Sequence, residues 1–221
     1  MSEPVVRTRS AFHIDVEKYC RVLYKTADPG VIRKVKLLVM NMGLHCIAVY
    51  RFGQFAMEFK RRHKVIGKPI RFAYLLMNYI VLLVHKTEFH ERSKIGPGFH
   101  ISHVGNIFIG PCKIGANCTV THNVTIGQGF ELSGNRVPII RNNVWIGTGT
   151  VISGNVTIGD GATISAGSIL TRSIPEKCLV AGNPARVINR EYDNSRMIVY
   201  EMNHWPGRVI GPGREETEML T

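Results

Sequence analysis

Two histidines, His103 and His122, occupy equivalent positions of a short repeat and offer proton-transfer chemistry. They follow the aliphatic residues Ile101 and Val120 by two positions each. If those aliphatic residues lie on neighbouring turns of one repeating backbone, the imidazoles stack at about the 4.8 Å spacing of adjacent strands. Stacked cations repel each other, so at least one ring stays neutral near pH 7 and can accept a hydroxyl proton. His103 is the predicted general base, and a pair of exposed corner histidines without chemistry is the alternative.

The five cysteines, unlike the two histidines, show no spacing that indicates a chemical role. Their number is odd, and no two are spaced as a close pair. This pattern argues against a disulfide framework and a zinc knuckle, and it favours small buried apolar residues in a reducing compartment. We therefore assign no chemistry to the five thiols, which are Cys20, Cys46, Cys112, Cys118 and Cys178.

Aliphatic residues with a period of six form the framework that must position the histidines. The period slips by one residue before Ile114 and is interrupted by a longer loop before Ile140. Its members are Ile95, Ile101, Ile107, Ile114, Val120, Ile126, Ile140, Ile146, Ile152, Ile158, Ile164 and Leu170. Three six-residue strands make a coil of about 18 residues, and stacked coils bury such a column as a continuous core. We expect a mainly β fold, a parallel β-helix of four to five coils over residues 95–180.

Before this repeat, apolar residues between residues 28 and 85 recur at helical spacing instead, for example Val35, Leu38 and Met42. A break at residues 67–69 separates two helical stretches, and Pro69 suits the first turn of the second. The chain therefore divides into an α-helical N-terminal domain (residues 1–90), a β-helix domain (91–188) and an irregular C-terminal tail (189–221).

The two halves of the chain also differ in charge. Of the 221 residues 44% are hydrophobic, enough for a packed core. Residues 1–94 contain 18 basic and 7 acidic residues, whereas residues 95–221 contain 10 and 9. No helix-turn-helix and no basic strand interleaved with aromatic residues accompanies the basic half, so we expect no nucleic-acid partner.

A basic cluster at residues 60–64 precedes an apolar run from Phe72 to Val84. This run has 13 residues, whereas a membrane span needs about 20. We expect a helix buried in an oligomer core, with peripheral contact to an anionic membrane surface as the second possibility. The polar first ten residues lack the features of a secretory signal, which predicts a cytoplasmic protein, with the inner face of the membrane as the alternative position.

Two further motifs accompany the hexads: Asn-Asn-Val-Trp-Ile-Gly at 142–147 and Ala-Gly-Asn-Pro-Ala-Arg at 181–186. In this combination the chain resembles the left-handed β-helix acyltransferases of hexapeptide repeats, and most of all their serine acetyltransferase branch. Ala-Val-Tyr-Arg at 48–51 is similar to a helical segment of that branch, and Ile-Ser-His at 101–103 to its Ile-Asp-His. The resemblance covers about residues 25–188 and implies acetyl transfer from acetyl-CoA to a hydroxyl, with no metal.

The resemblance implies roles for individual residues. His103 aligns with the catalytic histidine of the family. Glu88-Phe89-His90 stands where the family has Asp-Ile-His, so Glu88 is the expected carboxylate that orients His103, and His90 an expected substrate contact. The alternative for Glu88 is a solvated carboxylate at a helix end.

The loop that ends in Gly-Asn-Arg-Val-Pro at 134–138 predicts the chemical class of the acceptor. It resembles the equivalent loop of serine acetyltransferases, which reads Gly-Asp-Arg-His-Pro and whose histidine helps to hold the amino acid. Val137 replaces that histidine, and a charged amino acid relies on paired polar contacts. We therefore expect a saccharide hydroxyl as acceptor, as in the similar capsule and exopolysaccharide O-acetyltransferases, contacted by His122 and Arg136. Serine O-acetylation in cysteine biosynthesis is the alternative.

Related sugar acetyltransferases bind acetyl-CoA in the groove between coils. Small residues there allow close approach of the coenzyme, and arginines suit its phosphates. The matching positions in this sequence are Thr148, Ala166, Thr171, Arg172 and Arg186.

The family resemblance also implies a homotrimer with active sites between the chains, and the helical domain allows two trimers to pair. Two other classes of protein remain open on the same fold. One is a zinc hydratase using His100, His103 and His122, for which convergence of the three rings looks poor. The other is a scaffold without activity, which need not bind acetyl-CoA.

Overall fold

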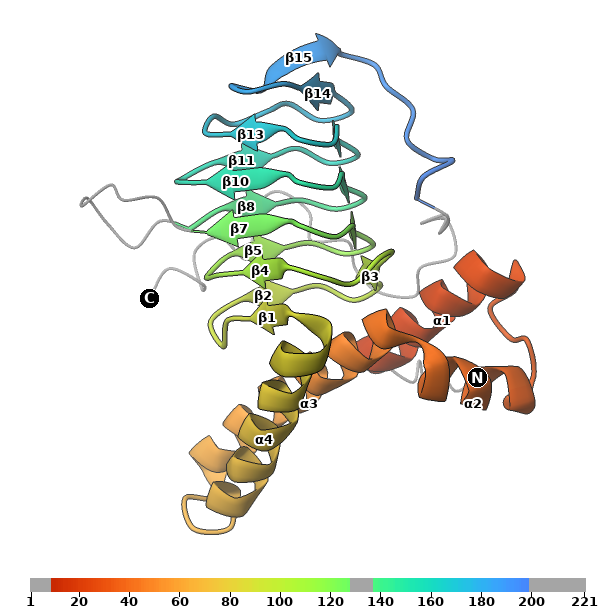
Figure 1. Cartoon of the computed structure of the whole chain (residues 1–221), viewed down its shortest axis with the longest axis vertical. Helices are drawn as coiled ribbons and strands as arrows, with labels where there is room; N and C mark the ends of the chain where they lie inside the picture. Colours follow the sequence, from red (N-terminus) through yellow and green to blue (C-terminus); the bar gives the residue numbers. More distant parts are fainter. Residues whose placement is uncertain (1–8, 128–136, 199–221) are drawn as a thin grey trace, which may run out of the picture.

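The computed structural model describes residues 9–127 and 137–198. Four helices come first: α1 (Ala11–Tyr24), α2 (Val31–Met40), α3 (Met42–Arg62) and α4 (Gly67–His85). Short strands follow and stack as coils above the helices, from β1 to β15 (Figure 1). We call α1–α4 the helical cap. This architecture confirms the predicted fold class, a left-handed parallel β-helix preceded by an α-helical N-terminal domain.

Each coil contributes one strand to each of three sheets. Sheet A contains β1 (Thr87–Phe89), β4 (Ile107–Ile109), β7 (Thr125–Gly127), β10 (Val151–Ser153) and β13 (Ile169–Leu170). Sheet B contains β2 (Lys94–Ile95), β5 (Lys113–Ile114), β8 (Ile139–Ile140) and β11 (Thr157–Ile158). Sheet C contains β3 (His100–Ile101), β6 (Thr119–Val120), β9 (Trp145–Ile146), β12 (Thr163–Ile164), β14 (Leu179–Ala181) and β15 (Arg186–Asn189). The strand pairs are parallel except that of β14 with β15.

The aliphatic column predicted from the six-residue period is the core of the β-helix. All twelve of its members are buried, and Ile95, the most exposed of them, keeps only 7% of its surface. The five cysteines are free and buried, as expected. Pro69 falls in the first turn of α4, as predicted, but the helical break lies at residues 63–66, before the predicted 67–69, because α3 ends at Arg62 and α4 begins at Gly67.

Two features differ from the sequence analysis. The first strand, β1, pairs with β4 from Thr87 onward, so the first coil begins before the boundary placed at residue 91. Helix α1 was not singled out, because the helical spacing was traced only from residue 28. Its buried face includes the charged residues Asp15 and Lys18, which disguise the apolar side of the helix in a hydropathy pattern.

Side chains of the helical cap satisfy the open end of the first coil. The Tyr19 hydroxyl accepts a hydrogen bond from Ile101 N at 2.9 Å and donates to Ile101 O at 3.3 Å. The Tyr50 hydroxyl likewise accepts from Ile95 N at 3.1 Å and donates to Ser93 O at 2.8 Å. Exposed strand edges favour pairing with other chains, and these side chains close the first edge within the same chain.

A buried ion pair completes this junction. Asp15 accepts hydrogen bonds from Arg51 at 2.8 and 3.2 Å and from Phe99 N at 3.0 Å. Arg51 also donates to Ile95 O at 2.6 Å and Gly96 O at 2.7 Å. The guanidinium and the carboxylate thereby satisfy each other and three backbone groups, which is what burial of charge requires.

Helices α3 and α4 form an antiparallel hairpin that projects from the cap away from the coils (Figure 1). A Cβ on Gly53 would lie 2.3 Å from the Tyr74 ring, and one on Gly67 would lie 2.5 Å from Lys60 Cα. Glycine at these two positions lets the helices approach closely. Within this single chain, only Gly67, Tyr74 and Val81 of α4 are buried, and the helix is long and apolar enough to cross a membrane. The expected burial of α4 therefore requires a partner beyond the chain itself.

Candidate active site

One corner of the β-helix carries both candidate histidines. In sheet C, Ile101 of β3 pairs with Val120 of β6, and β6 is followed in the stack by β9, β12 and β14. On each of these strands, the residue two positions after the buried core residue therefore lies in one column. From the helical cap upward, the column reads His103, His122, Thr148, Ala166 and Gly182. We call these five residues the histidine corner. After the two histidines, the side chains become smaller along the column, from threonine to alanine to glycine.

The structure brings the two imidazoles into contact at this corner. The ring centroids of His103 and His122 are 6.0 Å apart, and the rings meet edge to face at 76°. His103 is exposed and His122 half-buried. The Thr148 hydroxyl donates a hydrogen bond to His122 O at 2.9 Å, and Gly167 N donates to Thr148 O at 2.7 Å. The corner is therefore an ordered edge on which an exposed imidazole can meet a substrate hydroxyl.

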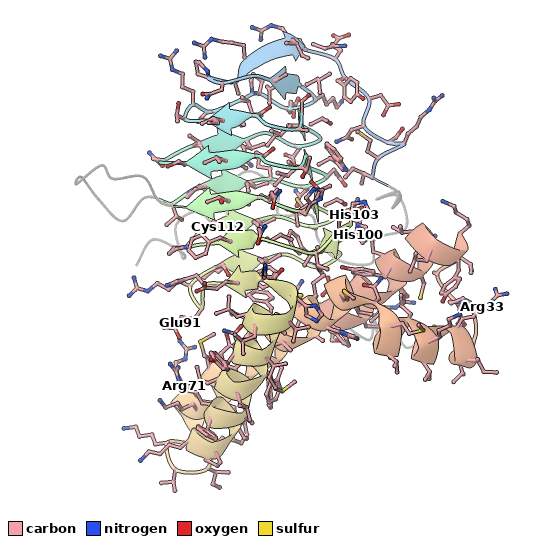
Figure 2. The ribbon with its side chains drawn as sticks, viewed as in Figure 1. Arg33, Arg71, Glu91, His100, His103 and Cys112 are labelled. Atoms are coloured by element: carbon pink, nitrogen blue, oxygen red, sulfur yellow. The ribbon has the colours of Figure 1, made fainter. Side chains whose placement is uncertain are left out.

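His100 lies three residues before His103 but faces the interior. Its ring packs edge to face on Tyr19 with a centroid distance of 4.6 Å, and only 7% of the residue is exposed. Burial, with the nearby Lys18 and His103 charges adding to it, lowers the pKa of His100 to about 3. Figure 2 shows His100 and His103 at the same edge of the β-helix, close to α1.

Lys18 of α1 is buried under this edge. Its ammonium donates hydrogen bonds to Asn117 O at 3.0 Å and Cys118 O at 3.2 Å. Burial lowers the pKa of Lys18 to about 7, against the opposing effect of the Cys118 and Asp15 charges. Lys18 and Tyr19 were not named as functional by sequence reasoning. The sequence signal that indicates their helix is Ser10, the N-cap of α1, whose residues reach strand β3 and the two residues before β6.

Among the described residues, no group of three histidine, cysteine or acidic side chains gathers as metal ligands do. In particular, His100 packs on Tyr19 inside the fold, whereas His103 is exposed on the corner. The three histidines considered for a zinc hydratase therefore do not converge.

The other predicted substrate residues lie on a second corner, which we call the loop corner. It follows the sheet A strands and includes His90, Val137 and Thr171. His90 is half-buried, and its Nδ1 accepts a hydrogen bond from Arg92 N at 3.1 Å. Val137 is half-buried and precedes β8. Arg136 lies outside the described residues.

Glu88 lies in β1, opposite Phe108 of β4. In the described parts of the chain it makes no hydrogen bond with His103. Because the histidine corner and the loop corner are at opposite edges of sheet A, one chain does not bring His90 and Val137 to the candidate base, and Glu88 lies between these corners in strand β1.

The predicted coenzyme residues are also distributed. Thr148 and Ala166 belong to the histidine corner, whereas Thr171 and Arg172 follow β13 on the loop corner and are exposed. Arg186 begins β15 at the far end of the β-helix, where its Nη1 donates to Ala185 O at 3.0 Å. Thr148 and Ala166 stand above His103 in the same column, where a bound thioester could approach the base.

The sequence and the fold of this chain are similar to those of known acyltransferases. The family model described as bacterial transferase hexapeptide (six repeats) matches residues 138–172. A serine acetyltransferase of Bacillus licheniformis is 33% identical over 178 residues, covering 80% of this chain and 77% of the relative. The structure of serine acetyltransferase from Brucella abortus strain S19 matches with a TM-score of 0.67 and 25% identity over 83% of this chain and 69% of that chain. The same enzyme solved in complex with coenzyme A gives a TM-score of 0.66 and 25% identity, over 81% and 67% of the two chains.

These relatives overturn the expected saccharide acceptor and the likeness to capsule and exopolysaccharide O-acetyltransferases. That expectation depended on the missing polar side chain at Val137. One position is a weak guide to an acceptor, because an amino acid is held by several polar groups at once and another group can replace a lost one. Identity of 33% extending over three quarters of such a relative is the stronger observation: the chain belongs to the serine acetyltransferase family of hexapeptide-repeat acyltransferases.

Proposed function

We propose that the protein transfers the acetyl group of acetyl-CoA to the hydroxyl of serine, giving O-acetylserine and coenzyme A. The similarity to serine acetyltransferases over 178 residues carries this proposal. The histidine corner supports it, because an exposed imidazole stands at the base of a column of small residues suited to a thioester.

In the proposed reaction, His103 removes the serine hydroxyl proton while the hydroxyl oxygen attacks the thioester carbonyl carbon. The resulting tetrahedral intermediate collapses when its carbon–sulfur bond breaks. The imidazolium then returns the proton to the departing thiolate, so the histidine ends the cycle neutral. Thr148 and Ala166 flank the reacting end of the coenzyme, and Thr171, Arg172 and Arg186 contact the rest of it, with the arginines on its phosphates.

A homotrimer would complete this site. In one chain Glu88 lies in strand β1 and makes no described hydrogen bond with His103, while His90 lies at the opposite edge of sheet A, so we propose that the loop corner of a neighbouring copy packs against the histidine corner. Glu88 of that copy would orient His103, and its His90 and Arg136 would contact serine. The helical cap would then be free to pair two trimers.

His122 is the proposed replacement for the polar group missing at Val137. Its ring lies beside His103 and is half-buried, so it can donate a hydrogen bond to the serine carboxylate. We also propose a cytoplasmic location, since the five free thiols suit a reducing compartment.

The experiment is thiol release from acetyl-CoA by the purified protein, with the product identified by mass spectrometry. L-Serine, D-serine, L-threonine and a panel of nucleotide-linked sugars and oligosaccharides are offered separately. The proposal predicts O-acetylserine from L-serine and little turnover of the other acceptors. Coenzyme A binding with no L-serine-dependent release would contradict it.

A further inference from the structure

The end of the α3–α4 hairpin combines exposed apolar and basic side chains far from the candidate active site. We call residues 60–72 the hairpin tip. Val65 is 78% exposed, Ile66 63% and Phe72 69%. The same segment carries four exposed cations, namely Arg61, Arg62, Lys64 and Lys68. Figure 1 shows this tip as the part of the helical cap most distant from the coils.

The tip has a positive charge that the chain itself does not neutralise. Glu58 pairs with both Arg61 and Arg62 and is the nearest acidic residue on α3. Lys64 and Lys68 form no ion pair within the described parts of the chain. Arg71 is turned back toward Glu91 at 3.4 Å, as Figure 2 shows, so it fixes the hairpin to the first coil.

The exposure of the tip is imposed by the packing of the hairpin. The absence of a side chain at Gly67 lets α4 begin directly against Lys60, and the Tyr74 ring fills the space over Gly53. The turn between the helices is therefore tight, and Val65 and Ile66 have no neighbouring element to cover them. Single exposed apolar residues are ordinary, but three of them in one short segment with four exposed cations form an amphipathic surface.

We propose that the hairpin tip docks on an anionic phospholipid bilayer, with its apolar residues in the headgroup boundary and its lysines on the phosphates. A second copy of the chain suits this surface less well, because pairing two tips would oppose their cations. A membrane span by α4 fits less well although the helix is long and apolar enough to cross a bilayer, because α3 packs against it through Gly53 and Lys60 and would carry its charged residues into the hydrocarbon.

Vesicle sedimentation tests the proposal with the full-length protein. We expect binding to vesicles of mixed phosphatidylcholine and phosphatidylglycerol at low salt and little binding to pure phosphatidylcholine. Each cation near such a surface changes partitioning about fivefold, so Lys64→Gln with Lys68→Gln should weaken binding roughly 25-fold. Val65→Ser with Ile66→Ser should weaken it about tenfold or more.

The matched control is Lys177→Gln with Arg190→Gln, which removes two exposed cations from the opposite end of the β-helix. It should bind like the unchanged protein. Equal loss in the control and the tip variant would mean nonspecific attraction of a basic protein and would overturn the proposal, as would absence of binding to anionic vesicles.

Three further measurements distinguish membrane docking from a second copy of the chain and from a membrane span. Light scattering of the tip variants should show an unchanged oligomeric state, whereas dissociation would assign the tip to an interface between copies. High salt should release the bound protein, and retention after the salt wash would indicate insertion of α4 instead. An Ile66→Trp variant should show a blue-shifted emission only with anionic vesicles, and no shift would count against burial of the tip.

Discussion

At the scale of single residues, three positions along the chain separate a buried histidine from an exposed one. His100 is held inside by the edge of Tyr19, and His103 is carried outward by the turn that follows β3. The same backbone thus offers two chemically different imidazoles. Only the exposed ring can meet a substrate, and the buried ring contributes to the stability of the site.

Burial of the His100 ring predicts that the free energy of unfolding falls in acid. Because the pKa of His100 is lowered to about 3 in the folded chain, against 6.5 for an unperturbed ring, the folded state takes up its proton only in strong acid. The stabilising contribution of neutral His100 is complete above pH 6.5 and is lost as the pH falls from 6.5 toward 3. The loss amounts to about 1.4 kcal/mol per pH unit in this window. Denaturant titrations at several pH values should show a shallower decline for His100→Gln, and an identical pH dependence would refute this role.

Substitution of Arg186 tests the proposed contact with the phosphates of the coenzyme. Arg186→Ala should raise the dissociation constant for coenzyme A about tenfold or more, because a charge-assisted hydrogen bond to phosphate is lost. Arg190→Ala removes another exposed arginine at the same end of the β-helix and should leave affinity unchanged. Calorimetry measures both, and equal affinities for all three proteins would remove Arg186 from the site.

At the scale of elements, the helical cap supports the β-helix by completing its first coil. Tyr19 and Tyr50 each hydrogen-bond to an N–H and a C=O that would otherwise have no strand partner. The strand held by Tyr19 is the one that precedes His103. Helix α1 therefore connects the stability of the cap to the position of the candidate base.

Removing the hydroxyl of Tyr19 or of Tyr50 measures how much the helical cap stabilises the first coil. Tyr19→Phe and Tyr50→Phe should each lower the free energy of unfolding by about 1–3 kcal/mol, since each leaves buried backbone groups unpaired. The Tyr24 hydroxyl lies 3.4 Å from Arg33 O near the surface, so Tyr24→Phe is the matched control and should change stability little. Urea unfolding gives the three values, and equal small effects would show that the cap does not close the coil in this way.

The elements also show how far the sequence could predict the structure. The aliphatic period gave the β-helix core because each hexad buries one residue regardless of its distant neighbours. The pairing of His103 with His122 followed from the same register. The Ser10 N-cap indicates that a helix begins there, but the contacts of Asp15, Lys18 and Tyr19 could not be predicted from it, because they involve residues more than 80 positions away. The acceptor was mispredicted from Val137, since no pattern in the chain says which polar groups can replace the missing one.

At the scale of the whole molecule, the two corners at the edges of sheet A require an assembly. Within the described residues of one chain, His103 has no ion pair or hydrogen bond with a carboxylate, and much of α4 is exposed. A trimer in which each histidine corner meets a neighbour's loop corner would resolve the first point. The basic hairpin tips would remain at the surface of this assembly.

Mixing experiments can test the shared site. Light scattering should return a trimer or a pair of trimers. His103→Ala and Glu88→Ala should each be nearly inactive, and subunits of the two variants reassembled together should regain activity, because some interfaces then combine an intact His103 with an intact Glu88. A monomer in solution, or no recovery on reassembly, would contradict a site shared between copies.

The most direct test of the account compares the unchanged protein with His103→Gln for serine-dependent release of coenzyme A. Loss of a general base predicts a fall in kcat of about 10²- to 10⁴-fold. Affinity for coenzyme A and thermal stability should stay the same, because His103 is exposed and its ring packs edge to face only on the similarly sized ring of His122 among the described aromatic residues. Near-normal turnover of serine by His103→Gln would contradict the assignment of the base and, with it, the histidine corner as the site of acetyl transfer.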